Sequence, residues 1–270
     1  MIITSSVTDL DLPDLQPYRT LRQSVAQFRR GLFVAEGEKV VRRLIDSPLL
    51  IVSVLLTPEW LKTLQPALEK RSEHIATFVA ARALLEQIVG FHLHQGIMAV
   101  GRVPAALRVT DLLDFPAPRL YVALDGLTNS ENVGVLVRNC AAFGTQALLA
   151  GETCSSPYLR RAVRNSMGAV FNLPVLHSQH LTDDLRTLGE NGFRVIAAHP
   201  HAEGRMLSEV DCRGDVCVVF GSEGAGISRG VLAVCHDAVA VPMQHGVDSL
   251  NVASAAAVFL YEIDRQRRST

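Results

Sequence analysis

Hydrophobic and polar positions alternate in a regular way from Leu120 to the end of the chain. Short apolar runs are followed by stretches in which apolar residues recur with the period of a helix. The runs that predict strands cover 120–126, 146–151, 194–200, 215–221 and 238–243, and the stretches that predict helices include 132–143, 158–170 and 183–192. This alternation predicts an α/β fold with a mostly parallel sheet covered by helices on both faces. Ligands of such folds bind at the carboxyl ends of the strands.

The first part of the chain has a mixed pattern that predicts a smaller α/β domain. The predicted helices are 34–44 and 81–89, and the predicted strands are 49–57, 76–80 and 96–103. A stretch rich in Pro and Ala follows. We therefore divide the chain into a first domain at 1–105, a linker at 106–119 and a second domain at 120–270.

Length and composition fit two globular domains. The chain has 270 residues, of which 48% are hydrophobic and 20% are charged, enough for a core in each domain. No apolar run approaches the ~20 residues that cross a bilayer. The chain begins with Asp9, Asp11 and Asp14 ahead of any basic residue, unlike a secretory signal or a transit peptide. We expect a cytoplasmic protein.

Cysteine usage and net charge exclude less. Five cysteines form no C-x-x-C pair, which favours reduced thiols over a disulfide framework or a metal site. The net charge of -1 gives no overall sign of a nucleic-acid binder, so local clusters matter more. Basic residues gather near both ends of the chain: Arg19, Arg22, Arg29, Arg30, Lys39, Arg42 and Arg43, then Arg265, Arg267 and Arg268.

Unusual residues follow the first strand of the second domain. Asn129 or Ser130 can cap the next helix, and Asn132 falls in its first turn. Arg138 should lie over Gly134, because helical side chains lean back over the preceding turn. An arginine with open space around it suits a phosphate or carboxylate partner. An ordinary surface arginine explains the pattern equally well.

Two later strand ends carry a glycine-rich loop and the loop before the last helix. FGSEGAGIS at 220–228 has three glycines within six positions, which lets a ligand approach the backbone. It lacks the Lys-Ser/Thr of a phosphate loop, and it does not follow the first strand as a dinucleotide fingerprint does. In VPMQHGVDSLNV at 241–252, Pro242 should end a strand, and Asp248 or Ser249 should cap the final helix.

The content and order of these three segments resemble the sequence motifs of the SpoU (TrmH) RNA 2′-O-ribose methyltransferases, in the SPOUT superfamily. The resemblance covers 120–264. FVAEGEKVV at 33–41 and HQGIMAVGR at 94–102 resemble the substrate-binding domain that precedes the catalytic domain in many members. Membership implies a parallel α/β sheet whose C-terminal segment is threaded as a deep trefoil knot, here within roughly 215–264. Knots are otherwise exceptional in proteins.

The resemblance also implies S-adenosyl-L-methionine as the cofactor, held in the knot largely by backbone groups. The implied contacts are Gly221, Val241 and Leu250, with Phe220, Gly224, Pro242 and Met243 lining the pocket and Ala198 beside it. His199 stands next to Ala198, and we interpret it as a local hydrogen-bonding residue rather than a catalyst.

The family's catalytic positions correspond to Asn132, Arg138, Glu223, Ser249 and Asn251. Because arginine keeps its proton in nearly all protein settings, we interpret Arg138 as a clamp rather than a base. It would bind the adjacent phosphate and stabilise negative charge on the 2′-oxygen. The other polar residues would orient Arg138 and the ribose, and Glu223 would anchor the glycine loop.

The implied partners are RNA and a second copy of the chain, joined through the knotted domain, with neither a membrane nor a metal. The candidate phosphate contacts of the first domain are Arg19, Arg22, Arg29, Arg30, Arg42 and Arg43. A separate substrate domain favours ribosomal RNA. The alternatives are a tRNA 2′-O-methyltransferase and a non-catalytic RNA-binding assembly factor, the latter disfavoured by the intact catalytic positions. The missing glycine fingerprint argues against a Rossmann dehydrogenase.

Overall fold

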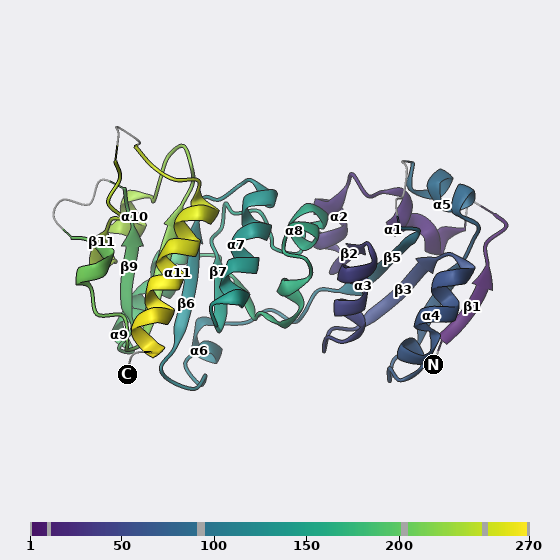
Figure 1. Cartoon of the computed structure of the whole chain (residues 1–270), viewed down its shortest axis with the longest axis horizontal. Helices are drawn as coiled ribbons and strands as arrows, with labels where there is room; N and C mark the ends of the chain where they lie inside the picture. The colour runs from purple at the N-terminus through teal and green to yellow at the C-terminus, as the bar shows by residue number, and fades with distance from the viewer. Residues whose placement is uncertain (1, 10–11, 91–94, 201–204, 245–247, 269–270) are drawn as a thin grey trace. The chain divides into compact units, whose positions relative to one another are not determined.

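The computed structural model describes residues 2–9, 12–90, 95–200, 205–244 and 248–268, and these form two compact units (Figure 1). Unit 1 comprises Met1–Ala105 together with Tyr158–Asn172, and unit 2 comprises Ala106–Pro157 together with Leu173–Thr270. The segment 158–172, which we had assigned to the second domain, therefore packs in the first.

The predicted linker is also more than a tether. Residues 109–112 form a short helix, α6 (Val109–Leu112), and Leu112 is fully buried in the core of unit 2. The hydroxyl of Tyr121 donates a hydrogen bond to the Leu112 carbonyl. The apolar residues among the Pro and Ala of this stretch explain the difference, because their burial fixes the backbone against unit 2.

Unit 1 is built on a five-stranded mixed sheet. Its strands, in spatial order, are β1 (Ile2–Ser6), β4 (Ile75–Val79), β3 (Ile51–Leu56), β5 (Ile97–Arg102) and β2 (Leu32–Glu36). The first three are parallel, and β5 is antiparallel to both of its neighbours. Its helices are η1 (Pro13–Leu15), α1 (Gln16–Arg19), α2 (Ser24–Arg29), α3 (Glu38–Ile45), α4 (Pro58–Glu69), α5 (Arg82–Val89), α8 (Arg160–Asn165) and η2 (Ala169–Asn172).

The helix predicted over 34–44 is wrong in its first third. Residues up to Glu36 belong to the edge strand β2, and the chain turns at Gly37 with φ +88° before α3 begins. Only glycine adopts that conformation without strain. The apolar residues before it satisfy a buried strand as well as a helix, so periodicity alone did not separate the two elements.

Unit 2 holds the predicted parallel sheet, and this prediction is confirmed. Its six strands, in spatial order, are β11 (Asp237–Val239), β9 (Arg194–Ala198), β10 (Val216–Gly221), β6 (Leu120–Asp125), β7 (Ala147–Ala150) and β8 (Val175–His177). All the pairings are parallel. The sequence analysis missed β8, which is only three residues long.

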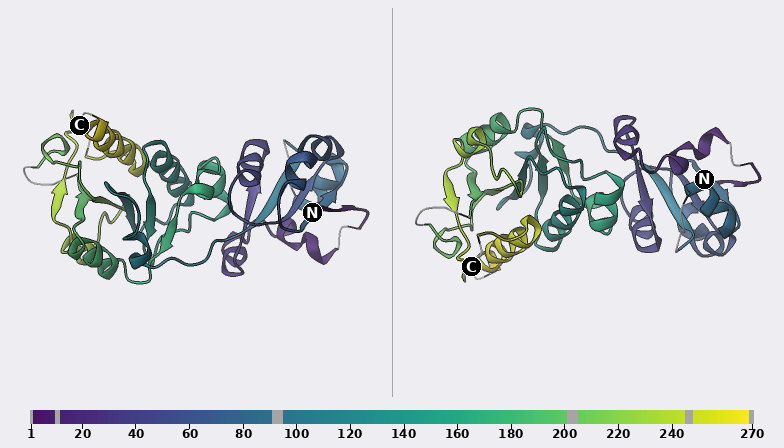
Figure 2. Two further views of the ribbon diagram at one scale, coloured as in Figure 1. Left: turned by 90° about the horizontal axis from the view of Figure 1, so that it is seen from below. Right: turned by 90° about the horizontal axis from the view of Figure 1, so that it is seen from above.

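Helices cover both faces of this sheet. On one face α7 (Ser130–Ala142) packs against α11 (Val252–Arg268), as Figures 1 and 2 show. The other face carries α9 (Leu181–Glu190), with α6 and α10 (Arg229–Leu232) against it; η3 (Leu207–Glu209) contacts α11. Side chains alternate accordingly: Tyr121 stacks on Phe193 at 4.8 Å on the α9 face, and Phe220 meets Phe259 of α11 edge-on at 5.7 Å.

Strand order fixes where a ligand can bind. From β6 the chain moves outward through β7 and β8, then crosses to the other side and continues with β9, β10 and β11. The order therefore reverses between β6 and β10, and their carboxyl ends meet at this switch point. Open α/β sheets bind ligands at such a place.

Candidate active site

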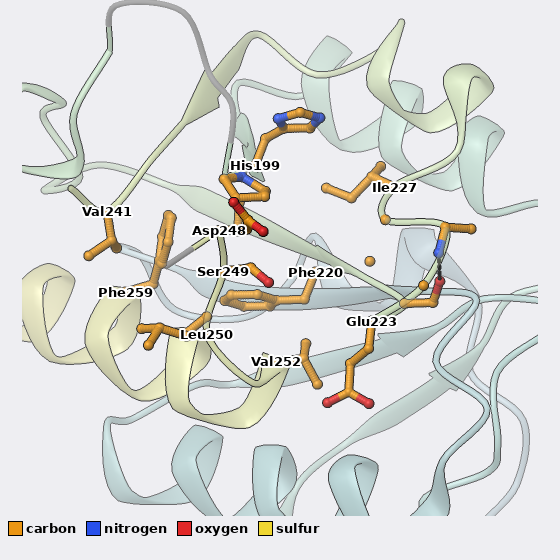
Figure 3. A pocket seen from close by; sticks show the side chains of 18 of the residues that line it. His199, Phe220, Glu223, Ile227, Val241, Asp248, Ser249, Leu250, Val252 and Phe259 are labelled. Atoms are coloured by element: carbon orange, nitrogen blue, oxygen red, sulfur yellow. Dashed lines mark hydrogen bonds between the residues drawn. The ribbon is translucent and has the colours of Figure 1, made fainter. Parts of the chain in front are cut away.

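A cavity of about 310 Å³ lies at the carboxyl ends of β9, β10 and β11, the size range of small-molecule sites. Figure 3 shows its lining residues pointing inward from separate segments. They include Ala198 at the end of β9 and His199 after it, residues 220–227 at the end of β10 and in the loop that follows, Asp248, Ser249 and Leu250 before α11, and Val252, Ala255 and Phe259 on α11. The site is thus assembled from the strand ends and the last helix.

The glycine-rich loop of this cavity closes on itself. Ser222 and Gly226 exchange two backbone hydrogen bonds, each 3.0 Å long. A side chain at Gly221 would place its Cβ 2.2 Å from the carbonyl carbon of Gly226, closer than any real contact. Gly224, by contrast, faces open space. Gly221 therefore allows the loop to form, whereas Gly224 leaves room on its cavity side.

The end of this loop is tied to the neighbouring strand through Asp125. Its Oδ2 accepts a 2.7 Å hydrogen bond from the backbone N–H of Ser228, and the hydroxyl of Ser228 caps α10 by accepting from Val231. Asp125 was not among the predicted site residues. The sign of its role in the sequence is a carboxylate at the end of a buried strand, next to a glycine.

The side chain of Asn251 binds two other predicted catalytic residues, Glu223 and Asn132. Its Nδ2 donates to Oε1 of Glu223 at 2.6 Å and to Oδ1 of Asn132 at 3.2 Å. Its Oδ1 accepts from the backbone N–H groups of Ala253 and Ser254 at 2.9 and 3.4 Å. Because backbone N–H groups can only donate, they fix which end of the amide faces Glu223. The loop after β10, α7 and α11 therefore meet at one side chain.

The same contacts correct the predicted helix cap. The final helix begins at Val252, and Asn251 caps it, not Asp248 or Ser249. An amide oxygen immediately before the first turn reaches the free N–H groups of that turn. Asp248 and Ser249 instead line the cavity.

The start of α7 is capped as predicted, by the first of the two candidates. The side chain of Asn129 accepts from the N–H groups of Glu131 and Asn132. Arg138, two turns on, is exposed, whereas Gly134 is buried. The expected open space over Gly134 therefore does not form, because α7 packs against α11.

Arg138 stands apart from the Asn251 cluster within this chain. In the parts of the chain that the structure describes, no hydrogen bond or ion pair connects Arg138 to Asn132, Glu223 or Asn251. A further residue that the sequence analysis missed is Asn139, whose Nδ2 donates to the Ala253 carbonyl at 2.7 Å and so ties α7 to the first turn of α11.

The predicted cofactor contacts come together, with one exception. Ala198, Phe220, Gly221, Gly224, Val241, Met243 and Leu250 all line the cavity. Pro242 is exposed and does not line it, and β11 ends at Val239, before the proline. Residues 245–247 of the last motif lie outside the described residues, as does His94 of the first-domain motif.

The basic residues predicted for RNA lie in unit 1. Arg19, Arg22, Arg29, Arg30 and Arg43 are exposed. Arg42 is half-buried: it pairs with Glu38 at 3.0 Å and lies over the ring of Trp60, 5.8 Å from its centre. Its guanidinium is therefore engaged by Glu38 and Trp60 and is less available to RNA than the exposed arginines.

Buried groups elsewhere in unit 2 have perturbed titration. Burial raises the pKa of the Cys217 and Cys140 thiols and lowers that of His177, whose Nε2 lies 2.9 Å from the Ser156 hydroxyl. The cysteines are free thiols. Across the described ranges no cluster of His, Cys, Asp and Glu could hold a metal ion. Among the helices described, none is long and apolar enough to span a membrane.

Known proteins are similar to this chain in sequence and in fold. The model of the SpoU rRNA Methylase family matches residues 119–261. The chain is also similar to a protein of Mycobacterium tuberculosis (strain ATCC 25618 / H37Rv) named as an uncharacterized tRNA/rRNA methyltransferase, with 33% identity over 267 residues that cover 96% of this chain and 91% of that protein.

Two solved structures extend the similarity over both units. An AdoMet-bound rRNA methyltransferase from Sinorhizobium meliloti has a TM-score of 0.84 at 23% identity and covers 97% of this chain and 98% of its own; at that identity the likeness concerns the fold. A structure described as an RNA 2′-O ribose methyltransferase has a TM-score of 0.75 at 27% identity and covers 99% of this chain and 100% of its own.

Proposed function

The chain belongs to the SpoU rRNA methylase family of RNA methyltransferases, and we propose that it transfers the methyl group of S-adenosyl-L-methionine to a ribose 2′-hydroxyl of ribosomal RNA. The observation that carries this proposal is the side chain of Asn251, which connects Asn132 and Glu223 at the rim of a cavity at the strand ends. A relative described as a 2′-O ribose methyltransferase supports the position of the transferred group.

The cavity suits the cofactor in shape and chemistry. Phe220, Leu250, Val252 and Phe259 give apolar walls for an adenine ring. The open side of Gly224 gives a ligand access to backbone groups. When bound, S-adenosyl-L-methionine supplies an electrophilic methyl group on a positively charged sulfur. Backbone groups of the glycine loop and of Val241 and Met243 would hold it.

The chain's own residues would position the ribose. Asn251 fixes Glu223 and Asn132 in place, which supports Glu223 as an anchor of the loop rather than a mobile base. Ser249 lines the cavity two residues before Asn251 and offers a hydroxyl to the sugar. Methyl transfer depends on alignment of the two reacting atoms more than on covalent help from the protein.

Arg138 would act on the RNA phosphate. Its guanidinium keeps its charge and is exposed, so it is available to an incoming backbone. A fixed cation beside the reacting sugar stabilises the negative charge that develops on the 2′-oxygen. This role needs no contact between Arg138 and the Asn251 cluster in the absence of RNA.

We further propose that two copies associate through α7 and α11. Val135 on α7 and Val258 and Tyr261 on α11 are exposed by 39%, 39% and 58%, and Tyr261 packs edge-on against Phe143, the residue that follows α7, at 6.3 Å. The two helices thus present one apolar face, and self-complementary faces of this kind form homodimers. Sedimentation velocity should show Tyr261→Glu as a monomer and the unaltered chain as a dimer; a dimeric variant would refute this face as the interface.

The course of the tail supports the knot implied by the family. The chain leaves β11 at one edge of the sheet, yet α11 packs on α7 and β10 beyond β9. The segment between them must therefore cross the carboxyl ends of β9 and β10. We propose that this crossing threads the tail within roughly 215–264. An experimentally traced chain that passes outside the loop before β10 would contradict this.

The proposed substrate class rests on architecture. A separate unit 1 carries exposed arginines, which suits a large structured RNA that needs positioning far from the reacting sugar, and we place the protein in the cytoplasm with that RNA. Transfer of labelled methyl groups to purified ribosomal RNA and tRNA pools tests this, with Arg138→Ala as the inactive control. Label in ribosomal RNA alone is expected; label in tRNA alone would reassign the substrate, and label in neither would leave an RNA-binding factor.

A further inference from the structure

A segment from the second half of the chain packs on the edge strand β2 of the sheet in unit 1. Tyr158–Asn172 belongs to unit 1, although the residues on both sides of it build unit 2. Its helix α8 packs on the edge strand β2. The ring of Phe33 in β2 packs against Tyr158 at 5.5 Å and Phe171 at 5.3 Å. A Cβ at Gly101 of β5 would lie 2.3 Å from the same ring, so the fold keeps this space for the aromatic contact.

Two polar contacts hold the segment in a fixed orientation. The guanidinium of Arg160 binds the carboxylate of Glu36 at 2.6 Å, and both side chains are largely buried. Arg43 of α3 donates to the carbonyl of Met167 at 2.6 Å, and Met167 has a φ of +54°, which is unusual for a residue other than glycine. The contact from Glu36 holds α8 on β2, and the contact from Arg43 joins α3 to the turn that follows α8.

Exposed cations lie on both of these helices. On α8, Arg161 and Arg164 are exposed and three residues apart; on α3, Lys39 and Arg43 are exposed and four residues apart. Residues at these spacings share a helix face. We name these four residues the α3/α8 basic surface. The side chain of Arg164 is 63% exposed and only 3.7 Å from Glu36, so that carboxylate, already bound to Arg160, leaves most of the guanidinium turned outward.

We propose that the α3/α8 basic surface binds the sugar–phosphate backbone of the RNA substrate. This inference deepens the proposed function and rests on it for the identity of the ligand. Because the cations lie on two different helices, they suit contacts with several phosphates of one RNA chain rather than with one small anion. Arginine suits this role because its planar fork binds phosphate through two donors. Arg161 and Arg164 lie outside every motif identified in the sequence.

The placement also gives α8 a role in both units. The chain leaves unit 2 after Pro157 and re-enters it at Leu173, so α8 is joined to the methyltransferase unit at both of its ends. RNA bound to α8 would therefore contact a segment that packs in unit 1 and is covalently joined to unit 2 at both ends. Removal of residues 1–105 would expose the buried side of this segment as well as delete α3.

The test is salt-dependent binding of a fluorescein-labelled ribosomal RNA fragment to the full chain. The variant Arg161→Glu/Arg164→Glu is compared with Arg186→Glu/Arg213→Glu, which changes exposed arginines of unit 2 that pair with nearby aspartates. We expect the α8 variant to bind at least about tenfold more weakly, with a salt slope shallower by about 2, since each phosphate contact contributes about 1. The control variant should bind like the unaltered chain.

Controls separate this inference from the proposed function. Unfolding temperature and S-adenosyl-L-methionine binding should be unchanged in both variants. Unaltered affinity and slope in the α8 variant would overturn the inference even if the protein methylates ribosomal RNA. Conversely, weakened binding in the α8 variant sustains the RNA surface even if methyl transfer is absent. An equal loss in both variants would overturn the inference, because it would reflect total charge.

Discussion

The side-chain amide of Asn251 lies 2.6 Å from the carboxylate of Glu223, although the two residues are 28 positions apart in the chain. One residue therefore begins the last helix and holds the glycine loop that follows β10. The side-chain oxygen of Asn251 accepts a hydrogen bond from the first turn of α11, and its side-chain nitrogen donates one to Glu223. This division of roles makes the consequences of substitution separable.

Asn251→Asp should retain the helix cap and lose the site. A carboxylate still accepts from the backbone N–H groups of α11, but it offers no donor and repels Glu223. We expect methyl transfer to fall about 10- to 100-fold, since hydrogen bonds to charged groups contribute roughly 1.5–3 kcal/mol, while the unfolding temperature changes little. Asn251→Ala should lose the cap as well, at about 1 kcal/mol of unfolding free energy. Full activity of the aspartate variant would contradict the role of the Nδ2 donor.

Substitution of alanine for two glycines of the same loop should affect stability at one position and not at the other. Gly221→Ala forces a Cβ against the backbone of Gly226, so we expect it to lower the unfolding free energy by about 1–3 kcal/mol and to abolish cofactor binding. Gly224→Ala meets no protein atom and should unfold like the unaltered chain. Thermal unfolding and calorimetric titration with S-adenosyl-L-methionine measure both effects. A normal unfolding temperature for Gly221→Ala would show that the loop closes differently.

Arg138→Ala should abolish methyl transfer and leave cofactor binding intact. The side chain is exposed and away from the cavity, so neither stability nor the affinity for S-adenosyl-L-methionine should change. Arg138→Lys retains the charge but not the bidentate fork, and we expect partial activity with the same pH profile as arginine. If the lysine variant instead regains full rate only near the pKa of the lysine, Arg138 acts as a base and the clamp is wrong.

Acid should destabilise unit 2 partly through His177. Burial lowers the pKa of this imidazole from its usual 6.5, so the unfolded chain binds a proton more readily than the folded one. The resulting stability is present above about pH 6.5 and is lost as the pH falls through the lower, folded value. Urea unfolding between pH 7.5 and 5 should therefore show a smaller loss of stability for His177→Gln than for the unaltered chain. Identical pH dependence of the two would contradict a buried neutral His177.

Local sequence patterns predicted most of the sheet in unit 2. Buried apolar runs such as those of β6 and β10 are long enough to be recognised, and Asn129 caps its helix as predicted. The three-residue β8 has too little pattern to predict. The cap of the last helix is Asn251 and not Asp248 or Ser249 as predicted, because Asp, Ser and Asn all cap helices and only the three-dimensional contacts distinguish them.

The remaining differences depend on contacts between distant residues. Nothing in the sequence of α8 indicates that it packs on β2, more than 120 residues earlier in the chain, since that placement follows from Glu36 and from the ring of Phe33. Asp125 was missed because its partner is a backbone N–H 103 residues later. The predicted cofactor contacts, apart from Pro242, line the cavity. They could be predicted because the carboxyl ends of parallel strands meet at one edge of the sheet.

The central claim is that the site at the strand ends methylates a ribose oxygen. The direct measurement is mass spectrometry of nucleosides from ribosomal RNA that has been incubated with the protein and S-adenosyl-L-methionine. We predict one 2′-O-methylnucleoside that is absent with Arg138→Ala and absent when the target ribose is replaced by 2′-deoxyribose. A methyl group on a base, or a ribose methylation that persists in Arg138→Ala, would contradict the account.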